Sequence, residues 1–591
     1  FKSKSRYNGF DNDLDSKIAW ISAEREKYCT AIVISRNIDL ILLFNKSWSI
    51  LHEKLERESI FLLSDVPTML SKIINANKDE RGEVSVMPFV FEKVGTSYNH
   101  FLIDEFQDTS NKQWEIFQAM LVEALSQNNR SIIVGDIKQS IYSWRGGDWK
   151  ILSDLVTNNL LDSFSNLESL GANYRTAENI VHVNNDFFAK EYGGNETTFN
   201  SKADKLYIDV AQDAMKKVKS EIEVRIVTRK DKTADKEVIK KEAVFDKMLE
   251  KIRIVQKEYK VSPSKITILV RKKSEAKYIA DQFFALSKDE TNDGVCYDVV
   301  SNEALYIKSN RAVRLIIAYI RYILKPADEL SKTEAAYLYH LESYKIEDSV
   351  KDFDAKAYNE ELDKMINGVD DKNAQLVDKQ SFEVVDAIID RLKLNKTKAN
   401  VPFLISFRNM VHDFSTRTTD LQSFVDYWDE RGVDTTLTLP ESQNAIKIIT
   451  VHKSKGLEAD YIFVPFCDWS LVSDVGTNYL FVEDKTFSSG DNPVKVPVVI
   501  SKDLELTSFN ADYMKDQLKK RVESFNLLYV AFTRAKYGLY VTASVEETKK
   551  ETKKDAEKES DIKRNVADLL KDYMSRELSE EWQRENNECT G

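Results

Sequence analysis

The stretch HFLIDEFQDTS, residues 100–110, is a short apolar run followed directly by two adjacent carboxylates, Asp104 and Glu105. A strand inside a parallel sheet is apolar on both sides because helices cover both faces, and its carboxyl end opens into the crevice where such sheets bind ligands. The pattern therefore predicts a buried parallel strand that presents two acids to a nucleotide. Asp104 would hold Mg²⁺ and Glu105 would orient the attacking water, the tasks that phosphoryl transfer requires of carboxylates. For this stretch taken alone, the start of a solvated loop is an open alternative.

A second apolar run that ends in an acid follows about thirty residues later: SIIVGDIKQSIYSWRGGD, residues 131–148. Three more blocks come after it, LGANYRT at residues 170–176, ITVHKSKGLE at 449–458 and LLYVAFTRAK at 527–536. The five blocks in this order resemble the motifs of UvrD/Rep-like superfamily 1 DNA helicases. The residues of the first two blocks are most similar to those of the RecB/AddA branch, which includes the exodeoxyribonuclease V beta subunit. The resemblance covers residues 100–540.

This resemblance implies an α/β fold with two RecA-like parallel-sheet motor domains, of which the first is incomplete in this chain, and with large helical insertions. It also implies an ATP-dependent DNA helicase and translocase that moves 3′ to 5′ and uses ATP and Mg²⁺. Such a motor would belong to a RecB/AddA-type helicase-nuclease in DNA double-strand break repair and recombination. The implied partners are single-stranded DNA or duplex ends and a second subunit similar to AddB or RecC, with no membrane.

One alternative is a non-catalytic DNA-binding scaffold subunit related to these motors. Such a relative would be expected to lose the acids and the phosphate-binding arginines, which this chain retains. A nuclease function would require a further carboxyl-terminal domain that is not seen in the sequence.

The resemblance assigns nucleotide chemistry to residues in all five blocks. Gln139 would donate to the γ-phosphate and report its presence, and Arg175 would bind phosphate oxygens through its planar donor fork. Arg534 would act as an arginine finger that reaches the transferring phosphoryl group when the two motor domains close. For either arginine, an ion pair with a nearby acid is the alternative. The other nucleotide-binding candidates are Tyr174, which would face the adenine, Glu458, which would accept from a ribose hydroxyl, Gln107 and Gly456.

On the DNA side, Trp144 is the principal candidate. An aromatic residue directly after the Gln139 loop can stack on a base of single-stranded DNA regardless of its sequence, because every base has a π-face. The alternative is a core tryptophan, which the small, flexible neighbours in the block SWRGG make less suitable. Tyr142, Arg145 and His452 are weaker candidates for the same groove, and Tyr142 could equally pack beneath the loop.

The sequence contains no G-x-x-x-x-G-K-[ST] loop, the turn whose backbone amides and lysine cradle phosphates. We therefore expect an internal fragment that lacks the first motor strand and this loop. The isolated chain would then be inactive in ATP hydrolysis, and a gap would lie beside the Asp104 strand.

Composition is consistent with a large, helix-rich protein. Gly 17 and Pro 9 are few for 591 residues, which favours long helices, and no apolar run approaches the roughly 18 residues of a membrane span. The net charge of −12 does not exclude DNA as a partner, because strand binding depends on a local groove and not on global charge. The four cysteines show no C-x-x-C spacing, so free thiols in a reducing cytoplasm are expected.

The predicted domain organisation alternates sheet-forming and helical segments. Strands are predicted at residues 223–227, 266–270, 446–449, 461–464 and 538–541, and apolar positions at helical spacing mark residues 38–55 and 382–392. The predicted boundaries are 1–95 for the remnant of a helical insertion of the first motor domain, 96–200 for part of that motor domain, 201–325 and 441–545 for the two parts of the second motor domain, 326–440 for its helical insertion and 546–591 for a charged helical or linker tail with a solvated face.

Overall fold

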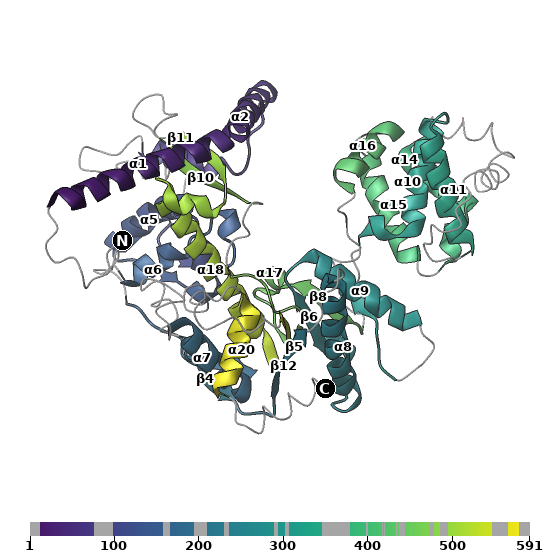
Figure 1. The fold of residues 1–591 in the computed structure, drawn as a ribbon. Helices are drawn as coiled ribbons and strands as arrows, with labels where there is room; N and C mark the ends of the chain where they lie inside the picture. Colours follow the sequence, from purple (N-terminus) through teal and green to yellow (C-terminus); the bar gives the residue numbers. More distant parts are fainter. Residues whose placement is uncertain are drawn as a thin grey trace. The chain divides into compact units, whose positions relative to one another are not determined.

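The fold is that of a computed structural model, drawn as a ribbon in Figure 1. The structure divides into two compact units, Phe1–Lys247 with Ser454–Gly591, and Met248–Lys453. The domain boundaries predicted within these units stay predictions. The described residues are 12–75, 98–157, 166–193, 210–229, 236–288, 294–301, 306–344, 379–397, 400–416, 418, 420–432, 435, 444–471, 478–484, 494–546 and 565–577.

The amino-terminal helices pack on a β-hairpin that lies far away in the sequence. Their shared core includes Val33 and Ile41 from the helices and Val482 and Val498 from the hairpin. The helices predicted for the first 95 residues are confirmed over 12–75, and residues 76–97 lie outside the described part, whereas the hairpin was not predicted. These elements are α1 (Asn12–Arg36), α2 (Ile38–Glu58), α3 (Val66–Asn75), β10 (Tyr479–Asp484) and β11 (Val494–Val499).

The predicted strand before Asp104 exists and is covered on one face only. β1 (Leu102–Ile103) pairs in parallel with β2 (Ile132–Ile133). One face packs on a core that contains Phe106 and Trp114, with α5 (Asn111–Ser126) and α6 (Trp149–Thr157) nearby. On the other face Leu102 is 80% exposed. The prediction of a strand buried on both faces is therefore wrong for Leu102, because no described element covers this side chain.

Two parallel sheets complete the first unit. In the larger one, β12 lies between β5 and β9, with Leu539 opposite Ile222 on one side and Ile462 on the other. The strands predicted at 223–227, 461–464 and 538–541 are thereby confirmed. The elements are β3 (Ala172–Ala177) and β4 (Asp213–Lys216), which pair with each other, α7 (Glu178–Gly193), β5 (Glu221–Arg229), β9 (Ala459–Val464), η11 (Lys502–Leu506), α18 (Asn510–Phe532) and β12 (Ala535–Glu546).

The charged tail does not present only a solvated face. Within it, α20 (Val566–Glu577) buries Val566, Leu569 and Leu570. The ring of Tyr573 lies edge-on to Phe187 at 5.1 Å, and its hydroxyl donates to Asp186 at 2.7 Å. The expectation of a solvated segment fails here because apolar residues at helical spacing are interleaved with the charges; residues 547–564 and 578–591 lie outside the described part.

The second unit contains a parallel sheet segment and a helical bundle. β8 lies between β6 and β7, and every residue of β6 is buried, as expected for a strand covered on both faces. Five helices, coloured teal to green in Figure 1, gather around one apolar core. The strands predicted at 266–270 and 446–449 and the helix predicted at 382–392 are confirmed. The elements are α8 (Lys236–Lys257), which begins in the first unit, η5 (Pro263–Lys265), β6 (Ile266–Val270), α9 (Lys273–Lys288), β7 (Val299–Val300), η6 (Ile307–Ser309), α10 (Arg311–Leu324), α11 (Glu329–Tyr344), α14 (Ser381–Arg391), η8 (Leu394–Lys396), α15 (Val401–Ser415), α16 (Leu421–Glu430), β8 (Ile446–Thr450) and α17 (Val451–Ser454).

Among the described helices, no single one is both long enough and apolar enough to cross a membrane. One bent pair, Asp15–Arg36 with Ile38–Glu58, meets the length and composition criteria when the two helices are taken together.

Candidate functional site

The two acids of the first block lie where β1 ends. The backbone N–H of Glu105 donates to Asp104 Oδ1 at 2.8 Å, and Glu105 adopts a φ of 51°, which turns the chain sharply into η1 (Phe106–Asp108). Gln107 is buried; its amide donates to the Glu105 carboxylate, and its Oε1 accepts from the backbone N–H of Asp136 at 2.9 Å. Gln107 therefore joins the end of β1 to the end of β2. Its predicted contact with the nucleotide stays a prediction.

A lysine that the sequence reasoning missed binds two of the three acids of this block, Glu105 and Asp108. Lys455 is 6% exposed, and its Nζ lies 3.1 Å from Glu105 Oε2 and 2.6 Å from Asp108 Oδ2. Burial raises the pKa of Asp108 although Lys455 opposes the shift, and the negative charge of Glu105 adds to it. The second oxygen of this carboxylate, Asp108 Oδ1, is buried without a hydrogen-bond partner in the described structure. Lys455 belongs to the block ITVHKSKGLE, which is the only signal that could have marked it.

The two predicted phosphate-binding arginines have different surroundings. Arg175, on β3, forms an ion pair through its Nε with Glu458 Oε2 at 3.2 Å. Lys536 also binds Glu458, and hydrogen bonding from Lys536, followed by the charges of Lys536 and Arg175, lowers the pKa of Glu458. The ion-pair alternative is thus realised for Arg175 in this structure. The predicted contacts of Arg175 with phosphate and of Glu458 with ribose stay predictions.

Arg534 is instead a buried guanidinium held by neutral acceptors. It is 2% exposed, and it donates to the carbonyl oxygens of Val530 at 3.0 Å and Leu457 at 3.2 Å and to Thr533 Oγ1 at 3.0 Å. Burial, followed by the positive charge of Arg175, lowers the pKa of Arg534 to about 10. None of its described contacts is with a carboxylate. A buried cation without a counter-ion is costly, and an oxyanion such as phosphate would supply the missing charge.

The second block places Gln139 and a short acidic turn at the end of β2. Gln139 closes η2 (Ile137–Gln139), and its amide donates to Asp136 Oδ2 at 3.1 Å. Lys138 Nζ lies 2.8 Å from Asp136 Oδ1. Asp136 and Glu105 both act electrostatically on Arg534. The structure therefore brings the first, second and last blocks within electrostatic reach of one another.

The remaining nucleotide candidates lie at the surface of this region. Tyr174 is 74% exposed, which leaves a ring face available for a base. Gly456 has a φ of +78°, a conformation that side chains rarely adopt, so the turn after Lys455 requires a glycine. For Mg²⁺, the described residues contain no group of three or more potential ligand side chains. Mg²⁺ at a nucleotide site needs only one or two carboxylates from the protein, because phosphate oxygens and water supply its other ligands. Asp104 and Glu105 fit this requirement.

The loop after Gln139 presents aromatic and basic groups together. Trp144, in η3 (Ser143–Arg145), is 65% exposed, so it is not a core tryptophan. The Arg145 guanidinium lies 4.6 Å from the centre of the Trp144 ring and 5.5 Å from that of Tyr142, and Lys455 Nζ lies 5.3 Å from the Tyr142 ring. This is the combination of aromatic faces and cations that suits single-stranded nucleic acid. His452 lies in α17, and its DNA contact stays a prediction.

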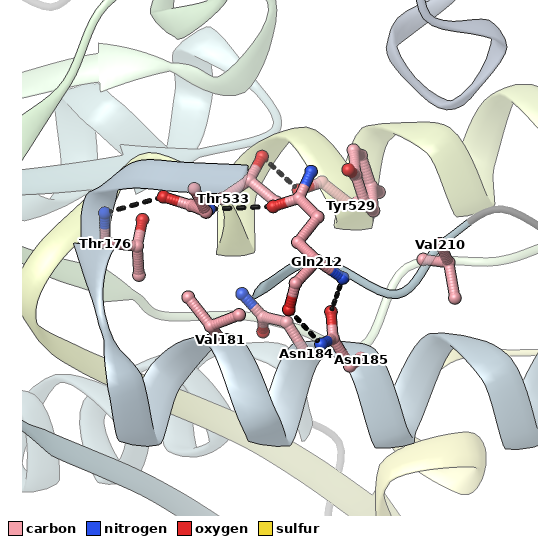
Figure 2. Close-up of a pocket in the computed structure, with 9 residues that line it drawn as sticks. Thr176, Val181, Asn184, Asn185, Val210, Gln212, Tyr529 and Thr533 are labelled. Carbon is pink, nitrogen blue, oxygen red and sulfur yellow. Dashed lines mark hydrogen bonds between the residues drawn. The ribbon is translucent and has the colours of Figure 1, made fainter. Parts of the chain in front are cut away.

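An amide network that the sequence did not predict underlies β3. Asn173 Nδ2 donates to Gln212 Oε1 at 2.7 Å, and Asn185 exchanges two hydrogen bonds with the backbone of Gln212. These side chains line one small pocket together with Tyr529 and Thr533, at the end of α18, and Figure 2 shows Gln212 and Asn185 there. The hydroxyl of Thr176 donates to the carbonyl oxygen of Ala535 at 3.0 Å. The network thus holds the strand of Arg175 against the segment that carries Arg534.

Comparison with known proteins agrees with this arrangement. Residues 24–158 match the UvrD/REP helicase N-terminal domain, and residues 169–336 and 333–546 match the UvrD-like helicase C-terminal domain. The chain is similar to the exonuclease/helicase subunit RexA of Lactococcus lactis subsp. cremoris, with 25% identity over 565 residues, 84% of this chain and 44% of that protein.

Two further relatives extend the same pattern. The RecBCD enzyme subunit RecB of Haemophilus influenzae is 22% identical over 572 residues, which cover 90% of this chain and 42% of RecB. The ATP-dependent DNA helicase PcrA of Staphylococcus epidermidis is 22% identical over 424 residues, 65% of this chain and 51% of PcrA. The chain spans about half the length of the curated relatives that it matches. These matches confirm the resemblance carried by the five blocks, and the chain belongs to the UvrD-like helicases.

Proposed function

We propose that the protein containing this chain is an ATP-driven DNA translocase and helicase that moves 3′ to 5′, the motor of a helicase-nuclease that processes DNA double-strand breaks. The observation that carries the proposal is the buried Arg534, whose charge has no carboxylate partner among its described contacts and which interacts electrostatically with Arg175, Asp136 and Glu105. This arrangement suits a site for a polyanionic substrate, which would compensate the two arginines.

The proposed roles follow from the positions of the side chains. Glu105, at the end of β1, would orient the attacking water, and Gln139 would donate to the terminal phosphate of ATP. Arg534 would stabilise the charge that develops on the transferring phosphoryl group. Mg²⁺, held by Asp104, would neutralise charge on the phosphate oxygens. In this structure Glu105 forms an ion pair with Lys455 through Oε2 at 3.1 Å.

The DNA side of the proposal rests on the exposed Trp144 and the cations beside it. Single-stranded DNA or a duplex end would be the substrate, and a second subunit similar to AddB or RecC would be the partner. We propose a cytoplasmic location because the four cysteines show no C-x-x-C spacing, as expected of thiols in a reducing compartment. The inactivity of the isolated 591-residue chain in ATP hydrolysis stays a prediction.

The test is DNA-stimulated ATP hydrolysis by the full-length protein with Glu105→Gln. We expect turnover to fall by about 10² or more, the usual scale of a lost general base. The matched control is Glu483→Gln, an exposed carboxylate on β10 that pairs only with Lys495 among its described contacts, and its turnover should equal that of the wild type. Absence of DNA-stimulated turnover in wild type would instead favour the non-catalytic scaffold, whereas equal, measurable turnover of Glu105→Gln and wild type would mean that Glu105 is not the general base.

A further inference from the structure

One side of α18 carries three contacts to the proposed machinery. Glu523, Asn526 and Val530 are spaced by three and four residues, so they lie on the same stripe of the helix. The Ser143 hydroxyl donates to the Glu523 carboxylate, and the Val530 carbonyl oxygen accepts from Arg534 Nε at 3.0 Å. Between them, Asn526 Nδ2 donates to the carbonyl oxygens of Ile137 and Ser140, both at 2.9 Å.

Each of these contacts reaches a different proposed functional group. Ile137 and Ser140 bracket Gln139, the proposed phosphate sensor. Ser143 opens the turn that presents Trp144, the proposed base platform. Arg534 follows the end of the helix directly. A single helix therefore connects the strand-binding loop, the sensor loop and the arginine, although the sensor loop and Asn526 are 386 residues apart in the sequence.

The residue type at position 526 is explained by these contacts. Asn526 is fully buried among apolar neighbours, Phe525, Leu527 and Leu528, where an aliphatic side chain would favour the helix and the core more. An amide nitrogen has two N–H donors, so Asn526 can satisfy two carbonyl groups at once. An aliphatic residue would leave both carbonyl oxygens of the sensor loop without this partner.

We propose that Asn526 is a positioning residue that couples strand binding at Trp144 to the phosphate site, by fixing the Gln139 loop to the helix that leads to Arg534. The inference rests on the proposed function, since it needs a site that hydrolyses ATP in response to DNA. A bound strand would displace the turn that carries Trp144. The hydrogen bond between Ser143 and Glu523 would pass this displacement to α18. Asn526 would then move the Gln139 loop together with the helix. Asn526 itself touches no substrate in this scheme.

The experiment measures ATP turnover of the full-length protein with and without saturating oligothymidylate, for wild type and Asn526→Leu. The readout is the ratio of the two turnover rates. We expect this ratio to fall by a factor of about 5 to 150, the range of typical coupling between sites, while the oligonucleotide still binds within a few fold of wild type. The matched control is Asn510→Leu, an exposed asparagine at the start of the same helix, which should keep the wild-type ratio.

The outcomes separate the inference from the function on which it rests. A wild-type protein whose turnover does not respond to DNA contradicts the proposed function itself. If wild type responds and Asn526→Leu lowers turnover by the same factor with and without DNA, Asn526 is only structural and the inference is wrong. Should Asn526→Leu not fold, Ser143→Ala decides, because it removes one half-buried hydroxyl from the same path: a lower ratio supports the inference, and an unchanged ratio overturns it.

Discussion

The helical bundle of the second unit and the candidate site of the first unit differ in where charged side chains lie and what they contact. The bundle core is built mainly from apolar side chains, and Arg321 forms an ion pair with Asp429 at 2.6 Å, where both side chains are partly exposed. In the candidate site, Arg534 is buried among neutral acceptors and Asp108 has one buried oxygen without a partner. Burial of charge is unfavourable for stability, so its concentration in one region marks where the fold serves a ligand and not only its own core.

Backbone geometry does not separate the two regions in the same way. Glu105 holds a left-handed φ of 51° at the end of β1, a conformation that is uncommon for a residue other than glycine, asparagine or aspartate. In the bundle, helices such as α10 and α16 begin with ordinary capping contacts from Asn310 and Asp420, but Lys393 also has a left-handed φ of 52°. The conformation alone therefore does not mark a site; in the first unit it falls on one of the two proposed catalytic acids.

The comparison predicts its largest difference for two arginines, the buried Arg534 of the candidate site and the exposed Arg408 of the bundle. Arg534→Ala in the full-length protein should lower ATP turnover by about 10³ or more and leave nucleotide affinity within a few fold, because the guanidinium acts mainly on the transition state. Arg408→Ala, which removes an exposed partner of Asp386 in the bundle, should leave turnover unchanged. Steady-state kinetics and nucleotide titration check both variants. If Arg534→Ala lowers ATP turnover only slightly, Arg534 is a structural residue and not an arginine finger.

Two tryptophans give the next, smaller contrast. Trp144→Ala should weaken single-stranded DNA binding by about 1–3 kcal/mol and uncouple ATP turnover from unwinding, because a stacking face is lost. Its effect on the free energy of unfolding should stay within about 0.5 kcal/mol, since Trp144 is exposed. Trp428→Ala in the bundle core, where its ring lies 5.3 Å from Phe407, should instead cost about 3–5 kcal/mol of stability.

Fluorescence anisotropy with a labelled oligonucleotide, unwinding per ATP hydrolysed and denaturant unfolding distinguish the two tryptophan variants. Unchanged unwinding per ATP in Trp144→Ala would overturn the assignment of this residue to the strand.

Contiguous patterns predicted much of the fold and the acids of the site. Asp104 and Glu105 follow an apolar run directly, and the strands at 266–270 and 538–541 are visible as local apolar runs, because parallel strands carry their signal within a few residues. The hairpin of β10 and β11 also alternates locally, since Val482 packs in its core between the exposed Phe481 and Glu483, although it was not predicted.

Contacts between distant segments could not be predicted in the same way. Lys455 and Asp108 are 347 residues apart, and no local period relates them. The exposed Leu102 could not be foreseen either, because an apolar residue in a strand signals burial whether or not another element covers it. The same limit applies to Asn526, whose polar side chain within an apolar helix segment is an anomaly in the sequence but has no partner until the fold is known.

The smallest expected effect is the change of stability with pH, which has opposite signs for Asp108 and Asp420. Burial raises the pKa of Asp108 above its ordinary 3.8, against the hydrogen bond and charge of Lys455 and together with the charge of Glu105. Hydrogen bonds from Ser423 lower the pKa of Asp420, at the start of α16, below 3.8. A raised carboxylate pKa means that the folded state binds more protons, so its stabilising contribution is present at low pH and is lost as the pH rises from 3.8 through the raised value. For Asp420 the contribution is present above 3.8 and is lost as the pH falls through the lowered value.

Asparagine at either position removes the titration while keeping the shape of the side chain. As the pH rises above 3.8, the Tm of wild type should therefore decline relative to that of Asp108→Asn. Relative to Asp420→Asn, the Tm of wild type should decline as the pH falls below 3.8. Thermal unfolding followed by circular dichroism at a series of pH values measures both differences. If wild type gained stability relative to Asp108→Asn as the pH rose above 3.8, the ion pair with Lys455 would outweigh burial, and the acids beside β1 would follow the same electrostatic rule as the bundle.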